Sequence, residues 1–147
     1  MLISNPVTSS ELAFPILECF HIAGFIVAIG ATAIVDFQIL GFGLSEPRPS
    51  QLAKGLRFWM LGGLIVAILS GMALYSSDPD MYYTNSSFLI KMACLIAALV
   101  FNYTIHRKVV RQDAVSGGAK VAACVSLTLW ASIVFGGIFI AFIPGGF

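Results

Sequence analysis

Residues 121–143 read VAACVSLTLWASIVFGGIFIAFI, and none of these side chains is charged. A helix of about 20 apolar residues spans the roughly 30 Å of hydrocarbon in a bilayer. Residues 13–35, 58–75 and 88–105 are apolar stretches of similar length. The sequence therefore predicts an all-α, polytopic membrane protein, folded as one four-transmembrane-helix bundle. The predicted helices cover about residues 13–42, 56–76, 87–106 and 121–143.

The distribution of basic residues predicts how the bundle is oriented. Seven of the eight Lys and Arg residues lie in the connections after the first and third apolar stretches: Arg48, Lys54, Arg57, Arg107, Lys108, Arg111 and Lys120. Lys and Arg accumulate in cytoplasmic loops. The connection 76–87 and both terminal segments contain no Lys or Arg. We therefore expect both termini to face outward, into the periplasm if the chain resides in a bacterial inner membrane.

The composition narrows the classes of function. Hydrophobic residues make up 59% of the chain, charged residues make up 10%, and the formal net charge is +1. This leaves no basic field for nucleic acid. Three cysteines, Cys19, Cys94 and Cys124, are too widely spaced to indicate a metal site or a disulfide framework. The expected partners are membrane lipid and either further copies of the chain or a larger membrane complex.

A few polar side chains interrupt the apolar stretches, and these are the functional candidates. They are Glu18 and His21 in the first stretch, Asp36 directly after it in the first predicted helix, and Lys91, Asn102 and His106 in or at the end of the third. Ionisable groups inside a membrane are costly, and they usually face the bundle interior, where a partner or cofactor compensates them.

Three of these candidates are predicted to lie close together near the outer surface. At 1.5 Å per residue, Glu18 and His21 lie about 8 and 12 Å below the outer edge, and Lys91 lies about 5 Å below it. Glu18 shares a helix face with His21 and is positioned either to orient the imidazole or to pair with Lys91. Lys91 alternatively snorkels to the headgroups or contacts an anionic group of a bound molecule.

His21 is the candidate ligand for a cofactor. Gly24 and Ala28 follow it on the same helix face, where a flat macrocycle against the helix requires small side chains. Imidazole is a common axial ligand of haem iron, and a haem propionate would suit Lys91. The alternative is a His21 bonded to a neighbouring helix, with Gly24 and Ala28 permitting close helix packing. Met72, at a similar depth, is a candidate second ligand.

At the inner end, His106 either ligates a metal or complements the negative end of the third helix at the headgroup level. Asp36 is expected to pair with Arg57 or His106. His21 and His106 should differ by about 20 Å in depth, so they do not ligate the same haem.

Several short runs resemble a family of short four-helix bacterial membrane proteins without an assigned function. They are FPILECFHIAG at 14–24, VDF at 35–37, FLIK at 88–91 and His106-Arg107. The runs around His21 and Lys91 also look distantly like the bacterial membrane-embedded protoporphyrinogen oxidase and copper-resistance membrane domains. This resemblance implies haem b, with His21 as its axial ligand and Lys91 as its neighbour. The chain lacks the Tyr-His dipeptide associated with that oxidase, which argues against the oxidase reaction.

These observations lead to one main hypothesis and two alternatives. The main hypothesis is a small b-type haem-binding subunit that transfers electrons between an outward-side donor and quinone or a partner protein. In this hypothesis the cofactor is bound by His21, Glu18, Gly24, Met72 and Lys91. Lys91 contacts either a haem propionate or a bound quinone. The first alternative is a cofactor-free structural or assembly subunit of a larger membrane complex. A small transporter or ion pathway is the second.

Overall fold

The computed structural model describes residues 10–43, 46–113 and 116–142, and every regular element in these ranges is a helix. The first two long helices are α1 (Ala13–Leu40) and α2 (Pro49–Tyr75). The third is a continuous run of α4 (Ser86–Phe101), the π-helical turn η1 (Asn102–His106) and α5 (Arg107–Gln112). The fourth is α6 (Gly117–Ile140), and a short helix, α3 (Pro79–Thr84), precedes α4.

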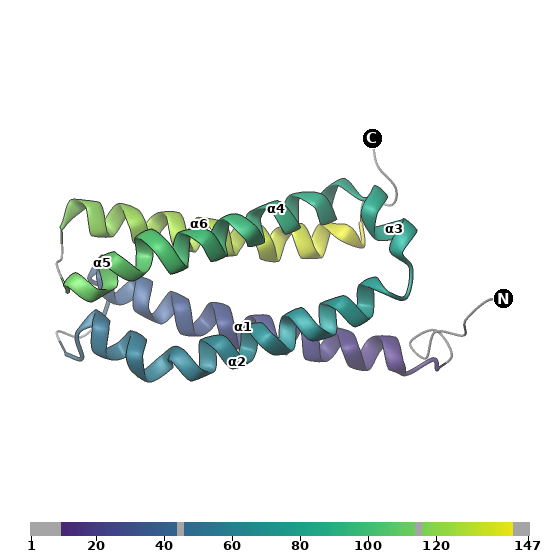
Figure 1. Ribbon diagram of the computed structural model, residues 1–147, viewed down its shortest axis with the longest axis horizontal. Helices are drawn as coiled ribbons and strands as arrows, with labels where there is room; N and C mark the ends of the chain where they lie inside the picture. The colour runs from purple at the N-terminus through teal and green to yellow at the C-terminus, as the bar shows by residue number, and fades with distance from the viewer. Residues whose placement is uncertain (1–9, 44–45, 114–115, 143–147) are drawn as a thin grey trace.

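The four long helical runs are each long and apolar enough to cross a membrane. Figure 1 shows them arranged as two pairs, with α1 beside α2 and α4 beside α6. Contacts between α1 and α6 join the pairs, and α5 contacts α2 at the end of the bundle that carries most of the basic residues, which we call the inner end. We call the opposite end, where α3 lies, the outer end (Figure 1). The chain is therefore a multi-pass, all-helical membrane protein, as its sequence predicts.

The interior of the bundle contains many small side chains, and most of the large apolar ones lie outside. Small residues let helix backbones approach closely where lipid supplies no hydrophobic drive for association. One buried cluster occupies the middle of the bundle: Ala28, Leu64, Leu95, Ala98, Trp130 and Ile133. A second lies towards the inner end: Val35, Ile39, Val110, Ala119 and Ala123.

Two helices begin earlier than the hydropathy pattern predicts. α2 begins at Pro49 rather than near residue 56. Proline is favoured in the first helical position, because the backbone N–H that it lacks would have no hydrogen-bond partner within the helix. The next turn is fixed by the Arg48 amide, which donates to the Gln51 side chain at 3.1 Å. α6 begins at Gly117 rather than 121, since the Ser116 hydroxyl caps it by accepting from the Ala119 amide.

The other helix ends also differ from the predicted bounds. The third run continues through the π turn to Gln112 and stops at Asp113, which adopts a left-handed conformation with φ 47°. α1 ends at Leu40, two residues before the predicted end, at a Gly41 with φ 92°. α6 ends at Ile140, and the predicted end at residue 143 lies outside the described residues.

Candidate functional site

His21 on α1 and Lys91 on α4 meet between the two helix pairs. Lys91 Nζ lies 3.3 Å from His21 Nε2, although the residues are 70 apart in the sequence. Both side chains are partly buried. Of the three side chains predicted to lie close together near the outer surface, His21 and Lys91 are thus in direct contact.

The hydrogen bonds of His21 define its tautomer. Nδ1 lies 2.7 Å from the backbone oxygen of Ala67 on α2 and 3.3 Å from the Ser70 hydroxyl oxygen. A carbonyl oxygen can only accept, so Nδ1 carries the proton. Nε2 then presents its lone pair, which accepts a hydrogen bond from the Lys91 ammonium group. A neutral imidazole oriented by a backbone carbonyl is the usual state of a metal-ligating histidine.

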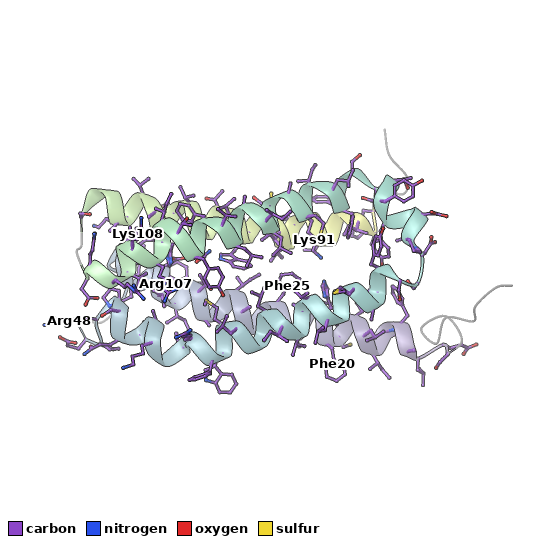
Figure 2. The ribbon with its side chains drawn as sticks, in the orientation of Figure 1. Phe20, Phe25, Arg48, Lys91, Arg107 and Lys108 are labelled. Carbon is purple, nitrogen blue, oxygen red and sulfur yellow. The ribbon has the colours of Figure 1, made fainter. Side chains whose placement is uncertain are left out.

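An aromatic ring and two glycines complete the surroundings of this pair. Phe25 contacts the His21 ring edge to face, with centroids 5.0 Å apart, and Lys91 Nζ lies 5.2 Å from the Phe25 centroid. Figure 2 shows Phe25 and Lys91 directed into the space between the helix pairs. A Cβ at Gly71 would lie 2.7 Å from the His21 ring, and one at Gly137 would lie 3.3 Å from Lys91 Nζ. These glycines make room for the two polar side chains.

Two residues predicted to act beside His21 do not lie there. Glu18 is exposed, and among the described residues no hydrogen bond or ion pair joins it to His21 or Lys91. The backbone oxygen of Ala67 orients the imidazole in its place. Met72 is 65% exposed on the outer surface of α2, because it follows Gly71 on a helix and faces a different direction.

Glu18 acts at the outer rim of the bundle instead. Burial raises the pKa of the Tyr82 phenol on α3, and the negative charges of Glu18 and Asp78 raise it further. Tyr82 packs with Tyr75 and Phe88 at this end of the bundle. Glu18 is thus close enough to α3 to influence a group there.

Gly24, which the spacing predicted at the cofactor, packs closely against the backbone of α2. A Cβ at this position would lie 2.7 Å from both the Ala67 nitrogen and the Gly63 oxygen on α2. The α2 backbone therefore occupies the space that a macrocycle beside Gly24 would need. Ala28 is fully buried in the same contact region, where a Cβ at Gly63 would lie 2.8 Å from its nitrogen.

His106 forms a second buried polar pair, with Asp36. Its Nε2 lies 2.5 Å from Asp36 Oδ1, and the two residues are 6% and 0% exposed. Of the two partners expected for Asp36, His106 is the one it has, because Arg57 is exposed on α2. His106 is not at the headgroup end of its helix, as α5 continues beyond it. Within the described ranges, no group of three or more His, Cys, Asp or Glu residues could hold a metal ion.

The two histidines occupy separate sites. Lys91 and His106 are 15 residues apart on one helical run, which corresponds to about 22 Å along the bundle. Each histidine has its own partner on a different helix. A single bound group does not reach both.

Comparison with known proteins places these sites in a family. A family profile matches residues 13–143, which include all four spans and both histidine pairs. The chain belongs to the DUF6644 family. That family is described as one of unknown function. No curated protein and no solved structure matches this DUF6644 chain.

Sequence reasoning missed several residues of the site in this DUF6644 protein. Phe25 lies four residues after His21 on α1, and this spacing could have predicted that the two rings share a helix face and make contact. Ala67 contributes only a backbone oxygen, which no side-chain pattern reveals. Gly71 and Gly137 resemble ordinary packing glycines until their neighbours are known.

Proposed function

We propose that this protein is a small b-type haem-binding subunit of the bacterial inner membrane, with His21 as axial ligand. It transfers electrons between an outward-side donor and quinone or a partner protein. The observation that carries the proposal is the His21 tautomer, with Nδ1–H held by the Ala67 oxygen and an unprotonated Nε2. A bound haem supplies reversible one-electron exchange at iron.

The residues around His21 fit a haem in donor type and charge. Nε2 is the nitrogen able to ligate iron, and its hydrogen bond from Lys91 must break for that to happen. Lys91 has a long, flexible side chain and packs beside Gly136 and Gly137, and the proposal requires its ammonium group to turn away from His21. Its ammonium group then suits a propionate or a quinone oxygen nearby.

The protein's own contribution is orientation and a dry environment. The Ala67 carbonyl holds the imidazole ring and increases its basicity as a ligand. Phe25 and the apolar core below it keep water from the inner side of the ring. Met72 is directed away, so a second protein ligand from this chain is not part of the proposal.

One observation favours a cofactor-free structural subunit as the second candidate. Both nitrogens of His21 already have partners within the chain, which satisfies this buried group without any ligand. A structural subunit could present small-residue faces to a larger complex, but Gly63 contacts α1, and Gly136 and Gly137 contact Lys91 inside the bundle. Gly62 alone of these has open space beside it.

A haem assay with matched histidine variants separates the two candidates. Wild type, His21→Ala and His106→Gln are produced in haem-replete cells, purified, and examined as reduced-minus-oxidised spectra. We expect a Soret band in wild type and His106→Gln and its loss in His21→Ala. If wild type contains no haem and co-purifies with other chains regardless of His21, the structural candidate replaces the proposal.

A further inference from the structure

The inner half of the bundle contains buried polar atoms that the proposed haem site does not use. Asp36 Oδ2, the Ser126 hydroxyl oxygen and Trp130 Nε1 have no hydrogen-bond partner within the described part of the chain. All three residues are at least nine-tenths buried. A buried polar atom normally has a partner in the protein or an ordered water, so these atoms indicate a site for a small polar ligand.

Helix register places these atoms along one line. Ala28 shares a buried cluster with Trp130, and Val35 shares the other with Ala123, so α1 and α6 run antiparallel in fixed register. Ser126 therefore lies about one helical turn, roughly 5 Å, outward of the Asp36 level. Trp130 lies a further turn outward. The Thr32 hydroxyl falls at the Ser126 level and donates to the Ala28 oxygen.

Apolar side chains close this line on the outer side. Leu95 and Ile133 are buried in the cluster with Trp130, and Phe25 and Ile29 pack against that cluster. They lie between Trp130 and the His21–Lys91 pair. On the inner side, His106 is only six residues before the end of α5, or about 9 Å. The polar line therefore approaches water only from the cytoplasmic end.

The π turn brings His106 to this position. The Arg107 amide bonds to the Asn102 oxygen, which inserts one extra residue into the helical turn. Such an insertion rotates the following side chains relative to the preceding α-helix. π turns are frequent at functional sites, although they are less regular than a continuous α-helix.

Within the described residues, the charge of Asp36 is compensated by His106 alone. The other ionisable side chains on the neighbouring elements are all exposed: Lys54 and Arg57 on α2, Tyr103 on η1, Arg107, Lys108 and Arg111 on α5, and Lys120 and Cys124 on α6. A buried carboxylate with one imidazole partner is stable when the imidazole carries a second proton. Loss of that proton leaves one uncompensated charge.

We propose that Asp36 and His106 form a protonation site that exchanges one proton with cytoplasmic water. Water bound at Asp36 Oδ2 and the Ser126 hydroxyl extends the site into the bundle. The proton is held between Asp36 Oδ1 and His106 Nε2, and a second imidazole proton, on Nδ1, is gained from or lost to the cytoplasmic side. This site stands independently of haem binding at His21.

Histidine NMR tests the proposal directly, because the chain contains only two histidines. Protein labelled with ¹⁵N-histidine in lipid nanodiscs gives two imidazole spin systems, and His21→Gln assigns them. We expect the His106 signals to move between imidazolium and neutral imidazole in one step as pH is varied over about 5 to 8. In Asp36→Asn, the step should differ from that of the wild type, because the compensating negative charge is gone.

Two results would overturn the proposal. One is a His106 ring that stays in a single protonation state while the wild-type protein remains folded across that range. The other is an identical titration in folded Asp36→Asn. Thr104→Val, an exposed change on the same π turn, is the matched control and should leave the titration unchanged. The wild-type titration decides the question even if Asp36→Asn does not fold.

Discussion

The Lys91 ammonium group donates a hydrogen bond to His21 Nε2 across 3.3 Å, joining α4 to α1 near the outer surface. Among the described residues, this contact joins the one Lys or Arg that lies away from the basic end of the bundle to the one histidine at that level. A second proton on the imidazole would bring two positive charges together. The arrangement is ready to bind a metal at Nε2 once Lys91 moves, and it also satisfies both groups when nothing is bound.

Gly71→Ala should disturb the His21 site without unfolding the bundle. Its new methyl would lie 2.7 Å from the imidazole Cε1 and 3.1 Å from Nδ1, so the ring must move. We expect the bond to Ala67 to weaken and the haem occupancy of the purified protein to fall several-fold, because second-shell bonds control ligand affinity. Gly62→Ala, on the same helix with open space around it, should keep the wild-type occupancy.

Gly24→Ala should destabilise the contact between α1 and α2. The added Cβ meets two backbone atoms of α2, which cannot turn aside as a side chain can. Overpacking of this kind costs about 1–3 kcal/mol. Unfolding in mixed detergent and SDS measures the difference. Gly30→Ala, on the same helix with nothing within 4 Å, should be neutral or more stable by up to about 1 kcal/mol, and equal losses in both variants would contradict the packing role.

The Asp113 carboxylate should make the stability of the protein depend on pH. The Ser50 hydroxyl and amide donate to its carboxylate at 2.7 and 2.9 Å, and these bonds lower its pKa. A carboxyl with a lowered folded pKa contributes stability above its unfolded pKa of about 3.9 and loses it as pH falls through the folded value. Asp113→Asn should therefore have a lower melting temperature at pH 7, with the difference closing in acid.

The control for this titration is Asp80→Asn on α3, whose carboxylate has no hydrogen bond among the described residues. It should leave the melting temperature unchanged at both ends of the pH range. Asn also tolerates the left-handed backbone at position 113, so the variant tests the carboxylate rather than the turn. A constant difference between wild type and Asp113→Asn down to pH 3 would show that ionisation is not responsible.

The orientation of the bundle is testable with cysteine labelling. Tyr83 on α3 lies at the end of the bundle predicted to face outward, and Arg111 on α5 lies at the opposite end, where the basic residues gather (Figure 1). Tyr83→Cys should react with a membrane-impermeant maleimide in spheroplasts, whereas Arg111→Cys should react only after permeabilisation. The parent chain, with its three native cysteines, gives the background. The reverse pattern would invert the predicted topology.

Hydropathy predicted the four-helix architecture because lipid imposes strict demands on the length and polarity of a spanning segment. The rise per residue of a helix also predicted that His21 and Lys91 lie at similar depths in the bundle, because it converts residue number into position along the helix. Helix ends were harder to predict. α2 and α6 extend into polar sequence because Pro49 and Ser116 start helices there, which a hydropathy window does not register.

The detailed contacts of the site depend on helix rotation, which depth does not determine. Glu18 and Met72 have suitable depths, but they face outward in the structure. The π turn at 102–106 could not be predicted, because an inserted residue leaves no mark in a pattern of apolar side chains. His106 was expected at a helix end because the apolar stretch stops before Arg107 and Lys108, but the helix continues through them and His106 is buried against Asp36.

The most direct test of the haem proposal is the hyperfine coupling between histidine nitrogen and ferric iron. Protein labelled with ¹⁵N-histidine is prepared as wild type, His21→Ala and His106→Gln, and each is examined by electron–nuclear double resonance. Coordination by His21 Nε2 predicts a strongly coupled ¹⁵N in wild type and His106→Gln and none in His21→Ala. A coupling that survives in His21→Ala, or a wild-type protein without haem iron, would contradict it.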